Sequence, residues 1–506
     1  MIPAEPVNLN KERGLIFTWS ITFLVLFPFL IFLGFLMRVG QAEMKKLFLS
    51  DFYSLMTLHG LGMTALMFSF AFAIIWYLIS SRYARLNIRI GYVVYFTFLI
   101  AIAGLTIGIL VGKFGAGWFL LYPLPFRSGT WLSWSTGVSI ISLIILGIAW
   151  LIGIAHLLYC LSKEFGGFIN LLGWQYLRKK EVKKELPTMV LVTTISLVPA
   201  ILAFVIGAVM LAMYLLQFIQ PSLKFDPLLL QNITLFFGHT FVSVTLFCGV
   251  AWIYEILPEF TGREWKVDKV LIYFWNATFL VILIAWVQNL YMDFLDPVSR
   301  QFSGQIINFL SAIPASIITI YGVILQFYHS KIKWNIIPLM FLSGIAGWAI
   351  AGFAATVEST VSVYKVLHNT MFVPGHLHTN MLMGVTLFIF GFLFYLFFEN
   401  GKQQAGKLAK AGFWLFVAAG YGFVLMFFLE GISGIPRRYA RYTGMGIKSM
   451  HDIAVEKAQI AVFFIILLSI GLLIMYYCLF SNLLKKTSSR FKTKSWIASI
   501  TKASEI

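Results

Sequence analysis

Charge is scarce in this sequence, and acidic charge is the scarcest. Only 11% of the 506 residues are charged, with 20 acidic against 38 basic side chains, while 60% are hydrophobic. A soluble chain carries about 25% charged residues, so this composition excludes a large soluble protein and is typical of one that crosses a membrane many times. No long polar interval divides the chain, so we expect a single membrane domain over residues 1–506. Membrane topology explains the excess positive charge, and we expect no nucleic-acid partner.

Cysteine is almost absent as well. Cys160, Cys248 and Cys478 lie in or beside hydrophobic runs, and none belongs to a CxxC pair. They therefore predict neither a disulfide framework nor a zinc site. The first hydrophobic run follows Glu5 and Glu12 without a small-residue cleavage site, so we expect a retained first helix and not a signal peptide.

Long hydrophobic runs are abundant. At about 20 apolar residues per crossing, the sequence predicts an all-α bundle of twelve transmembrane helices, from about residue 15 to 482, followed by a basic tail at 483–506. We expect the helices near residues 15–37, 53–80, 88–112, 131–161, 188–217, 227–257, 269–292, 305–328, 334–357, 366–398, 409–430 and 457–482. With these bounds, 25 of the 38 Lys and Arg fall on the side of the two termini. This bias predicts that both termini are cytoplasmic, in a membrane of the prokaryotic cytoplasmic type.

Three of the eight histidines fall in one membrane-length segment, Val361–Val385, which opens a hydrophobic run that ends at Phe398. They are His368, His376 and His378. At about 100° per residue, the last two point about 200° apart on an α-helix, so they cannot bind one metal together. A single helix between two hemes, with one iron on each face, requires this arrangement. The alternative, ordinary polar residues at a helix mouth, is disfavoured because ionisable groups are costly in lipid and imidazole is a common iron ligand.

Two further histidines, His59 and His239, lie inside predicted membrane helices. With the predicted orientation, they share the outer half of the bilayer with His376, which lies about ten residues, or roughly 15 Å, into its helix. Imidazoles at one level indicate a common site. The outer loop after the eleventh helix contains Arg437 and Arg438, which either bind anionic heme propionates through charge-assisted bonds or face lipid headgroups.

Four motifs spread over the twelve predicted helices resemble those of subunit I of the heme-copper oxidases. They are TLHG around His59, FFGHTF around His239, HNTMFVPGHLH at 368–378 and IPRR at 435–438. The pattern HNT-x-x-VPGH-x-H is similar to the B-type branch in particular, and the resemblance covers essentially the whole chain.

The resemblance implies a role for each histidine of these motifs. His59 and His378 match the two axial ligands of a low-spin heme, and His376 matches the proximal ligand of a high-spin heme, where the oxidant binds. His239 matches the first of three histidines that hold a copper ion called CuB. Four further residues match positions near the heme propionates, namely His368, Asp293, Arg437 and Arg438.

The sequence departs from the family at the copper site. The family's adjacent His-His pair, matched without gaps over 268–314, falls on Gln288 and Asn289, and its redox tyrosine falls on Ser243. One imidazole and two amides bind copper far more weakly than three imidazoles. We therefore expect a site that is empty or holds another ion, with Tyr254 as the tyrosine that remains on this helix.

A path for protons is weakly marked. Tyr254, Thr245 and Glu255 on the sixth predicted helix, with Ser316 and Thr319 on the eighth, form a candidate connection between the inner surface and the high-spin heme. The alternative for Glu255 is a hydrated carboxylate at the inner interface.

The resemblance implies a respiratory oxidoreductase subunit that passes electrons from the low-spin to the high-spin heme and reduces dioxygen or a related small oxidant such as nitric oxide. This chain has no paired cysteines to hold the family's dinuclear copper, so the donor would be a partner subunit II or a membrane quinol, in a hetero-oligomeric complex. The altered copper ligands favour an alternative, a non-catalytic diheme paralogue in electron transfer or assembly. Twelve spans also occur in secondary transporters, but no internal repeat is visible here.

Overall fold

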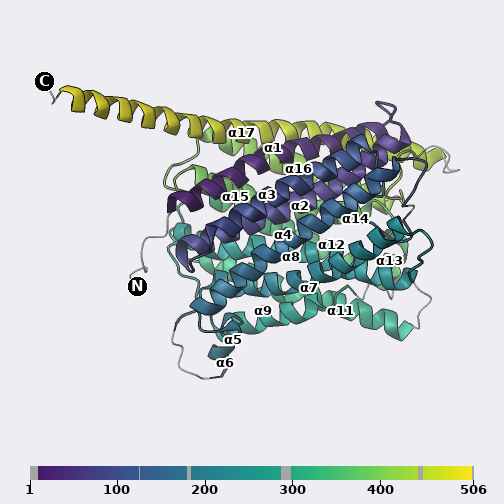
Figure 1. Ribbon diagram of the computed structural model, residues 1–506, viewed down its shortest axis with the longest axis horizontal. Coiled ribbons are helices and arrows are strands. Elements are labelled where there is room, and N and C mark those ends of the chain that lie inside the picture. The colour runs from purple at the N-terminus through teal and green to yellow at the C-terminus, as the bar shows by residue number, and fades with distance from the viewer. Residues whose placement is uncertain (1–8, 125, 179–183, 287–297, 443–447, 504–506) are drawn as a thin grey trace.

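The computed structural model describes residues 9–124, 126–178, 184–286, 298–442 and 448–503. Over these residues the chain is a bundle of helices that run mostly along one direction (Figure 1). The helices are α1 (Leu9–Gln41), α2 (Leu49–Arg82), α3 (Ile88–Thr106), the π-helix η1 (Ile107–Val111), α4 (Ser133–Glu164), α5 (Phe168–Leu171), α6 (Trp174–Leu177), α7 (Thr188–Ile219), α8 (Pro227–Thr261), α9 (Lys269–Ile282), α11 (Val298–Phe327), α12 (Ile336–Ser359), α13 (Val361–Leu367), α14 (Phe372–Asn380), the π-helix η2 (Met381–Val385), α15 (Thr386–Phe397), α16 (Lys407–Ile432) and α17 (Lys448–Ala503).

The prediction of an all-α membrane bundle is confirmed. Eleven segments of the described chain are long and apolar enough to cross a membrane. The remaining predicted helix, at 269–292, corresponds to the shorter apolar helix α9, whose helical residues end at Ile282. Gln288, Asn289 and Asp293 follow this point and lie outside the described residues.

Local signals mark the start and end of the helix that carries His239. The side chain of Asp226 accepts a hydrogen bond from the backbone N–H of Leu229, and Pro227 occupies the first turn of α8. Both features satisfy or remove backbone donors that a helix leaves unpaired at its start. The helix ends at Gly262, whose φ of 69° is a left-handed conformation that favours glycine.

The helix predicted at 366–398 is interrupted. α13 ends at Leu367 and α14 begins at Phe372, and the π-helix Met381–Val385 then separates α14 from α15. His376 is therefore the fifth residue of α14, and not about the tenth of one long helix. His376 and His378 nevertheless share the regular α-helical part, so the angle between them is the one expected from sequence.

The interruption has a cause in a distant part of the chain. The backbone N–H of Met371 donates to the carbonyl of Ile435 at 2.9 Å, and that of Arg437 donates to the carbonyl of Asn369 at 3.0 Å. Of the residues between α13 and α14, His368 and Thr370 thus still donate to carbonyls of α13, whereas Asn369 and Met371 bond to the loop after α16. The motifs HNT and IPRR, far apart in sequence, meet here.

Two spans form the centre of the bundle. Of the most hydrophobic window of α2, 89% is buried inside the protein, and of the span Phe372–Phe397, 83%, against at most 61% in the other spans. These two segments carry His59, His376 and His378. The three histidines expected to bind heme iron therefore belong to the spans that lipid reaches least.

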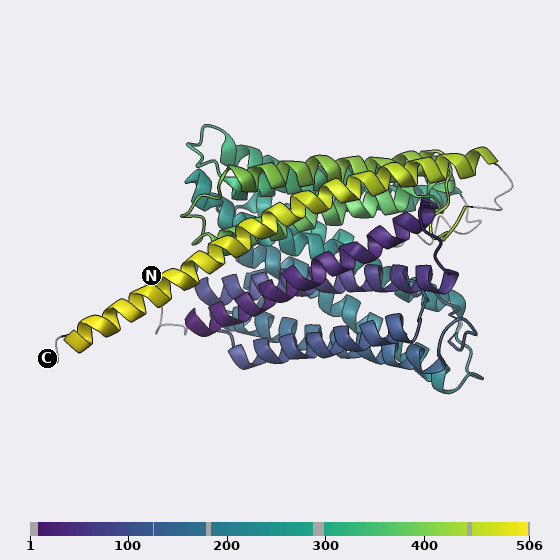
Figure 2. The same ribbon diagram turned by 90° about the horizontal axis from the view of Figure 1, so that it is seen from above.

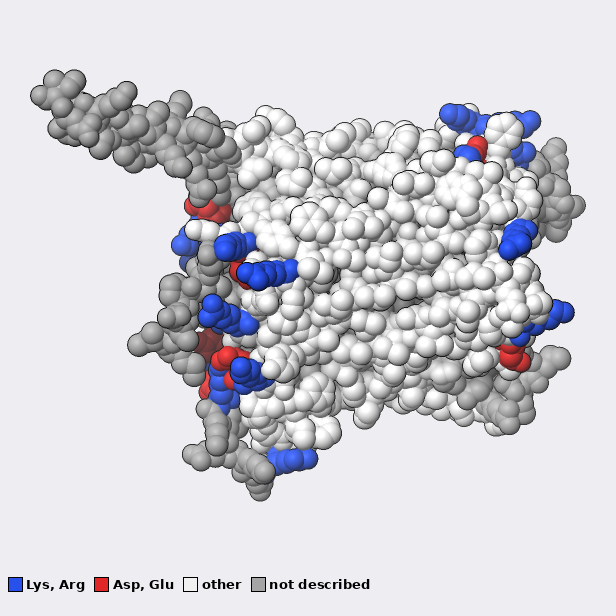
Figure 3. Space-filling model, viewed as in Figure 1, with Lys and Arg blue, Asp and Glu red and all other residues white. Residues whose placement is uncertain are grey.

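The surface and the chain ends agree with a membrane-spanning bundle. On the face shown in Figure 3, charged side chains gather at two ends, and a wide uncharged belt lies between them. Such a belt is what the hydrocarbon layer requires, because charge is costly there. α1 begins and α17 ends at the same end of the bundle (Figures 1 and 2).

Candidate functional site

His59 and His378 face each other across a gap of definite size. Their ring centroids are 6.2 Å apart and their planes differ by 14°. Two nitrogen–metal bonds of about 2 Å, with roughly 1 Å from each nitrogen to its ring centre, add up to about 6 Å. The pair therefore fits a single metal ion held between two nearly parallel imidazoles, as in a heme with two axial histidines.

Hydrogen bonds orient both rings for such a role. The Nδ1 atom of His59 lies 2.8 Å from the carbonyl oxygen of Leu30, and that of His378 lies 2.7 Å from the carbonyl oxygen of Pro374. A carbonyl only accepts, so each Nδ1 carries the proton and each Nε2 keeps its lone pair. This arrangement is the usual one for metal-ligating histidines.

Gly34 makes room for the ring of His59. A Cβ at this position would lie 2.8 Å from the Cε1 atom of His59, closer than real Cβ atoms come to other atoms. Leu30, whose carbonyl binds the same ring, precedes Gly34 by one turn of α1. The missing side chain thus lets the imidazole reach the backbone of the neighbouring helix.

A cavity of about 240 Å³ surrounds this histidine pair. Its wall is mostly apolar and includes Phe27, Phe423 and Phe427. It is rich in thioethers, which adapt to an irregular, polarisable group such as a porphyrin. The methionines in the wall are Met37, Met56, Met63, Met67, Met371 and Met381.

A second, larger cavity of about 760 Å³ lies on the other side of α14. His376 lines only this cavity and His378 lines only the smaller one, while Leu377 between them lines both. The helix is therefore a shared wall that offers one imidazole to each side. His239 and His368 also line the larger cavity, so α8, α13 and α14 bring their predicted histidines together.

The copper position is the part of this cavity that differs from the resemblance. Ser243 lines the wall, and its hydroxyl donates to the backbone carbonyl of His239 at 3.0 Å. Gln288 and Asn289 lie outside the described residues. Among the residues that the structure describes, no group of three or more His, Cys, Asp or Glu could hold a metal ion.

Arg437 and Arg438 line both cavities, which places them at the end of the wall that the two share. Burial, and then the charge of Arg437, lowers the pKa of Arg438 to about 9. Its guanidinium packs 3.7 Å from the ring centroid of Phe119. Because arginine keeps its proton in proteins, two adjacent half-buried cations favour anionic partners, as heme propionates would be.

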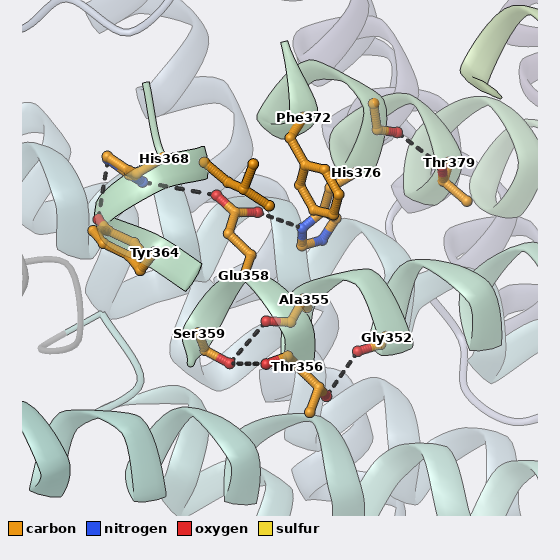
Figure 4. A network of polar contacts seen from close by, with 12 residues as sticks. Gly352, Ala355, Thr356, Glu358, Ser359, Tyr364, His368, Phe372, His376 and Thr379 are labelled. Carbon is orange, nitrogen blue, oxygen red and sulfur yellow. Dashed lines mark hydrogen bonds and ion pairs between the residues drawn. The ribbon is translucent and has the colours of Figure 1, made fainter. Parts of the chain in front are cut away.

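Sequence reasoning missed Glu358, which ends α12 beside the larger cavity. One carboxylate oxygen lies 3.2 Å from Nδ1 of His376, and the other lies 3.7 Å from Nδ1 of His368 (Figure 4). The guanidinium nitrogen Nη2 of Arg437 lies 3.4 Å from Nε2 of His368. Through His368, the carboxylate thus connects the ligand candidate His376 to Arg437.

Sequence reasoning also missed a buried ion pair whose arginine lines the smaller cavity. Arg38, 4% exposed, lies 2.6 Å from the carboxylate of Glu430, which is fully buried. The guanidinium packs 4.8 Å from the ring centroid of Phe427, whose ring lies 5.0 Å from that of His378. Separated by most of the chain, Arg38 and Glu430 gave no local signal.

The candidate proton path is connected only in part. The hydroxyl of Tyr254 lies 3.0 Å from that of Thr319, and Ser316, one turn away on α11, lines the larger cavity. Tyr254 itself lines neither cavity. Fifteen residues of α8, or about 22 Å along the helix, separate it from His239, which lines the larger one. Thr245 bonds only its own helix, at the carbonyl of Phe241.

Glu255 is not a simple hydrated carboxylate. It lies 2.6 Å from the guanidinium of Arg82 and accepts a hydrogen bond from Tyr83. Arg82 also pairs with Glu259 at 2.8 Å. The C-terminal end of α2 is thereby tied to the C-terminal part of α8, so Glu255 has a structural role.

The bundle and its two cavities define the class: a many-span membrane protein whose histidines line two cavities on opposite sides of one helix. Residues 14–463 match the family described as Cytochrome C and Quinol oxidase polypeptide I. The chain therefore belongs to this family, the subunit I family of the heme-copper oxidases, and resembles a terminal-oxidase subunit I.

Individual relatives are distant. The cytochrome c oxidase subunit 1 of the scallop Pecten maximus is 28% identical over 338 residues, which cover 65% of this chain and 68% of that protein. The cytochrome c oxidase polypeptide 1 of Halobacterium salinarum is 27% identical over 220 residues, 43% of this chain and 36% of that protein. That alignment spans well under two thirds of the relative's length.

A solved structure shares the fold. A chain from a cryo-EM structure of a heme-copper terminal oxidase dimer superposes with a TM-score of 0.73 at 20% identity, covering 93% of this chain and 84% of the other. At this identity the likeness supports the fold alone.

Proposed function

We propose that this chain is the heme-bearing subunit I of a respiratory membrane oxidoreductase, with a low-spin heme between His59 and His378 and a high-spin heme on His376. The observation that carries the proposal is the geometry of the first pair, 6.2 Å apart and nearly parallel, on the opposite side of α14 from His376. The hemes would supply the electron-transfer chemistry. The protein's own residues orient them and separate their two faces.

The two cavities suit hemes with different functions. In the smaller cavity His59 and His378 would both hold the iron, which suits a heme that only accepts and passes electrons. His376 occupies one side of the larger cavity and leaves the other to a small oxidant, dioxygen or nitric oxide, with His239 as the imidazole that faces it. Arg437 and Arg438 would neutralise the propionates. His368 and Asp293 are proposed to lie near the propionates of the high-spin heme.

The copper site is proposed to be incomplete. Gln288 and Asn289 stand where the family has imidazoles, and amide oxygens are poor copper ligands. His239 would then act as a single imidazole, able to hold or release one proton beside the oxidant. Ser243 offers no phenol to this reaction.

The membrane topology of the chain, its electron donor and its proton path are also part of the proposal. The chain is proposed to form one membrane domain with both termini in the cytoplasm of a prokaryotic-type cell, because the charge bias and the common end of α1 and α17 agree. Electrons would come from a subunit II or a quinol within a hetero-oligomeric complex. Tyr254, Thr319 and Ser316 are proposed to carry protons from the inner side toward the larger cavity.

Two substitutions test the assignment of the hemes. His378→Ala is expected to abolish the low-spin signal in reduced-minus-oxidised spectra and to leave carbon monoxide binding intact. His376→Ala is expected to do the reverse, because the two side chains serve different cavities. Loss of both signals from either substitution, in protein that still accumulates in the membrane, would contradict the proposal.

Turnover separates this function from a non-catalytic diheme paralogue, which the sequence at Gln288, Asn289 and Ser243 favours. The purified complex is supplied with a reduced donor and then with dioxygen or, without oxygen, nitric oxide. A catalytic subunit consumes one of these. Two hemes with no consumption of either would establish the paralogue.

A further inference from the structure

The three imidazoles proposed to bind iron differ in what holds their second nitrogen. His59 and His378 donate Nδ1–H to neutral backbone carbonyls, those of Leu30 and Pro374. His376 instead donates to a carboxylate oxygen of Glu358 at 3.2 Å. The protein therefore gives a charged partner to the open heme site and neutral partners to the closed one.

Glu358 is placed to keep its charge for this contact. It is 8% exposed, at the last turn of α12, and the hydrogen bond from His376 takes the place of water and favours the charged carboxylate. Among the described side chains it is ion-paired only with histidines, His376 and His368, and with no lysine or arginine. The negative charge is therefore not cancelled by a permanent cation next to it.

The second histidine strengthens this arrangement. Nε2 of His368 lies 3.4 Å from a guanidinium nitrogen of Arg437, which only donates, and 3.0 Å from the hydroxyl of Tyr364. With Nε2 accepting, the proton of a neutral His368 is on Nδ1, which faces the carboxylate. Figure 4 shows Glu358 between the two rings, with a dashed line to each. At 3.7 Å the second contact is longer than a hydrogen bond, and it adds only electrostatic attraction to the carboxylate.

A carboxylate acceptor changes the ligand. It draws the Nδ1 proton toward itself, which makes Nε2 more basic and a stronger donor to a metal. A stronger donor, with negative charge nearby, favours the oxidised state of iron and lowers its reduction potential. An electron-rich iron also favours cleavage of an O–O bond, as the thiolate ligand does in other heme enzymes.

We propose that Glu358 is a positioning residue that places negative charge on His376 and so makes the iron of the high-spin heme a stronger electron donor to its substrate than a neutral histidine would. This inference depends on the proposed function, since it needs a heme on His376. The charge of Glu358 would act on the iron from the proximal side, which is the side of His376. The incomplete set of copper ligands on the distal side would contribute less to the reaction.

Glu358→Gln tests the proposal, because glutamine keeps the shape and an acceptor oxygen but loses the charge. The midpoint potential of each heme is measured by spectroelectrochemistry, and the iron–histidine stretching frequency by resonance Raman spectroscopy of the reduced protein. We expect the high-spin potential to rise, favouring reduced iron by about tenfold or more, which is about 59 mV for one electron. The stretching frequency should fall, and the low-spin heme in the same molecules should not change.

Ser359→Ala is the matched control. Ser359 is the next residue on α12, is fully buried, lines the same cavity and bonds only to the carbonyls of Ala355 and Thr356. It is expected to leave both hemes unchanged. An equal shift in this variant would mean that any disturbance of α12 alters the heme, and would overturn the proposal.

The remaining outcomes are also decisive. If Glu358→Gln holds no heme, Glu358→Asp replaces it, and the longer contact to His376 should give a smaller shift in the same direction. An unchanged high-spin potential and stretching frequency, in protein with both hemes, would overturn the role of Glu358 and leave the proposed function intact. Wild-type protein without two heme populations would refute the proposed function, and this inference with it.

Discussion

Replacing Gly34 with alanine probes the contact that positions His59. The added Cβ would lie 2.8 Å from Cε1 of the ring, while ordinary contact begins at 3.4 Å, so the ring must move by about 0.6 Å. Metal–ligand distances tolerate about 0.2 Å. The displacement is three times larger than this, and it also loosens the bond from Nδ1 of His59 to Leu30. The low-spin site should therefore be weakened specifically.

Two opposing effects determine the magnitude. Alanine in place of glycine inside a helix is worth about 1 kcal/mol to the helix itself. Overpacking at the contact costs about 1–3 kcal/mol, which corresponds to roughly 5- to 150-fold weaker retention of the low-spin heme. We therefore expect Gly34→Ala protein to accumulate normally and to lose low-spin absorbance selectively.

The assay compares low-spin absorbance, measured in reduced-minus-oxidised spectra, with carbon monoxide binding in the same sample. Gly14→Ala is the control, because it makes the same change in α1 where the new Cβ meets only Tyr92 at 3.4 Å. An unchanged low-spin heme in Gly34→Ala, or equal losses in the two variants, would refute the reasoning. It would mean that the absence of a side chain at Gly34 is not what lets His59 reach the carbonyl of Leu30.

Three further predictions concern the metal, the protons and the propionates. Metal analysis should find well under one copper per chain beyond any in a partner subunit, because Gln288 and Asn289 are poor copper ligands; a full equivalent would contradict this. Tyr254→Phe should slow turnover by about tenfold or more with unchanged heme spectra, since it removes only the hydroxyl bonded to Thr319; equal rates would exclude the path. Arg438→Ala should cost about 2–5 kcal/mol of heme affinity, measured by transfer of heme from the variant to an apoprotein acceptor. Arg441→Ala is the control and should keep its heme affinity, because Arg441 lines neither cavity.

The local part of the site was predictable from sequence because helix geometry fixes it. Two residues apart on one helix, His376 and His378 have to point to different sides, and the structure places them in the walls of different cavities. The hydrophobic runs likewise predicted the bundle, because each crossing requires a minimum length of apolar chain. These inferences need no knowledge of how the helices pack.

The contacts between distant segments were not predictable. The break before α14 arises because Met371 bonds to Ile435, and nothing near Met371 in sequence signals it. Glu358 looked like the end of an ordinary span, and only packing brings it to His376. Glu255 looked like a membrane acid, and the structure pairs it with Arg82 on another helix. Side-chain partners of this kind follow from tertiary structure and not from periodicity.

The central claim is that two irons lie on opposite sides of α14 and that only one of them has an open face. The most direct test is to measure the iron content of the purified chain together with its stoichiometry of carbon monoxide binding in the reduced state. The account predicts two irons per chain and one carbon monoxide. A single iron per chain, or carbon monoxide bound to both, would contradict it.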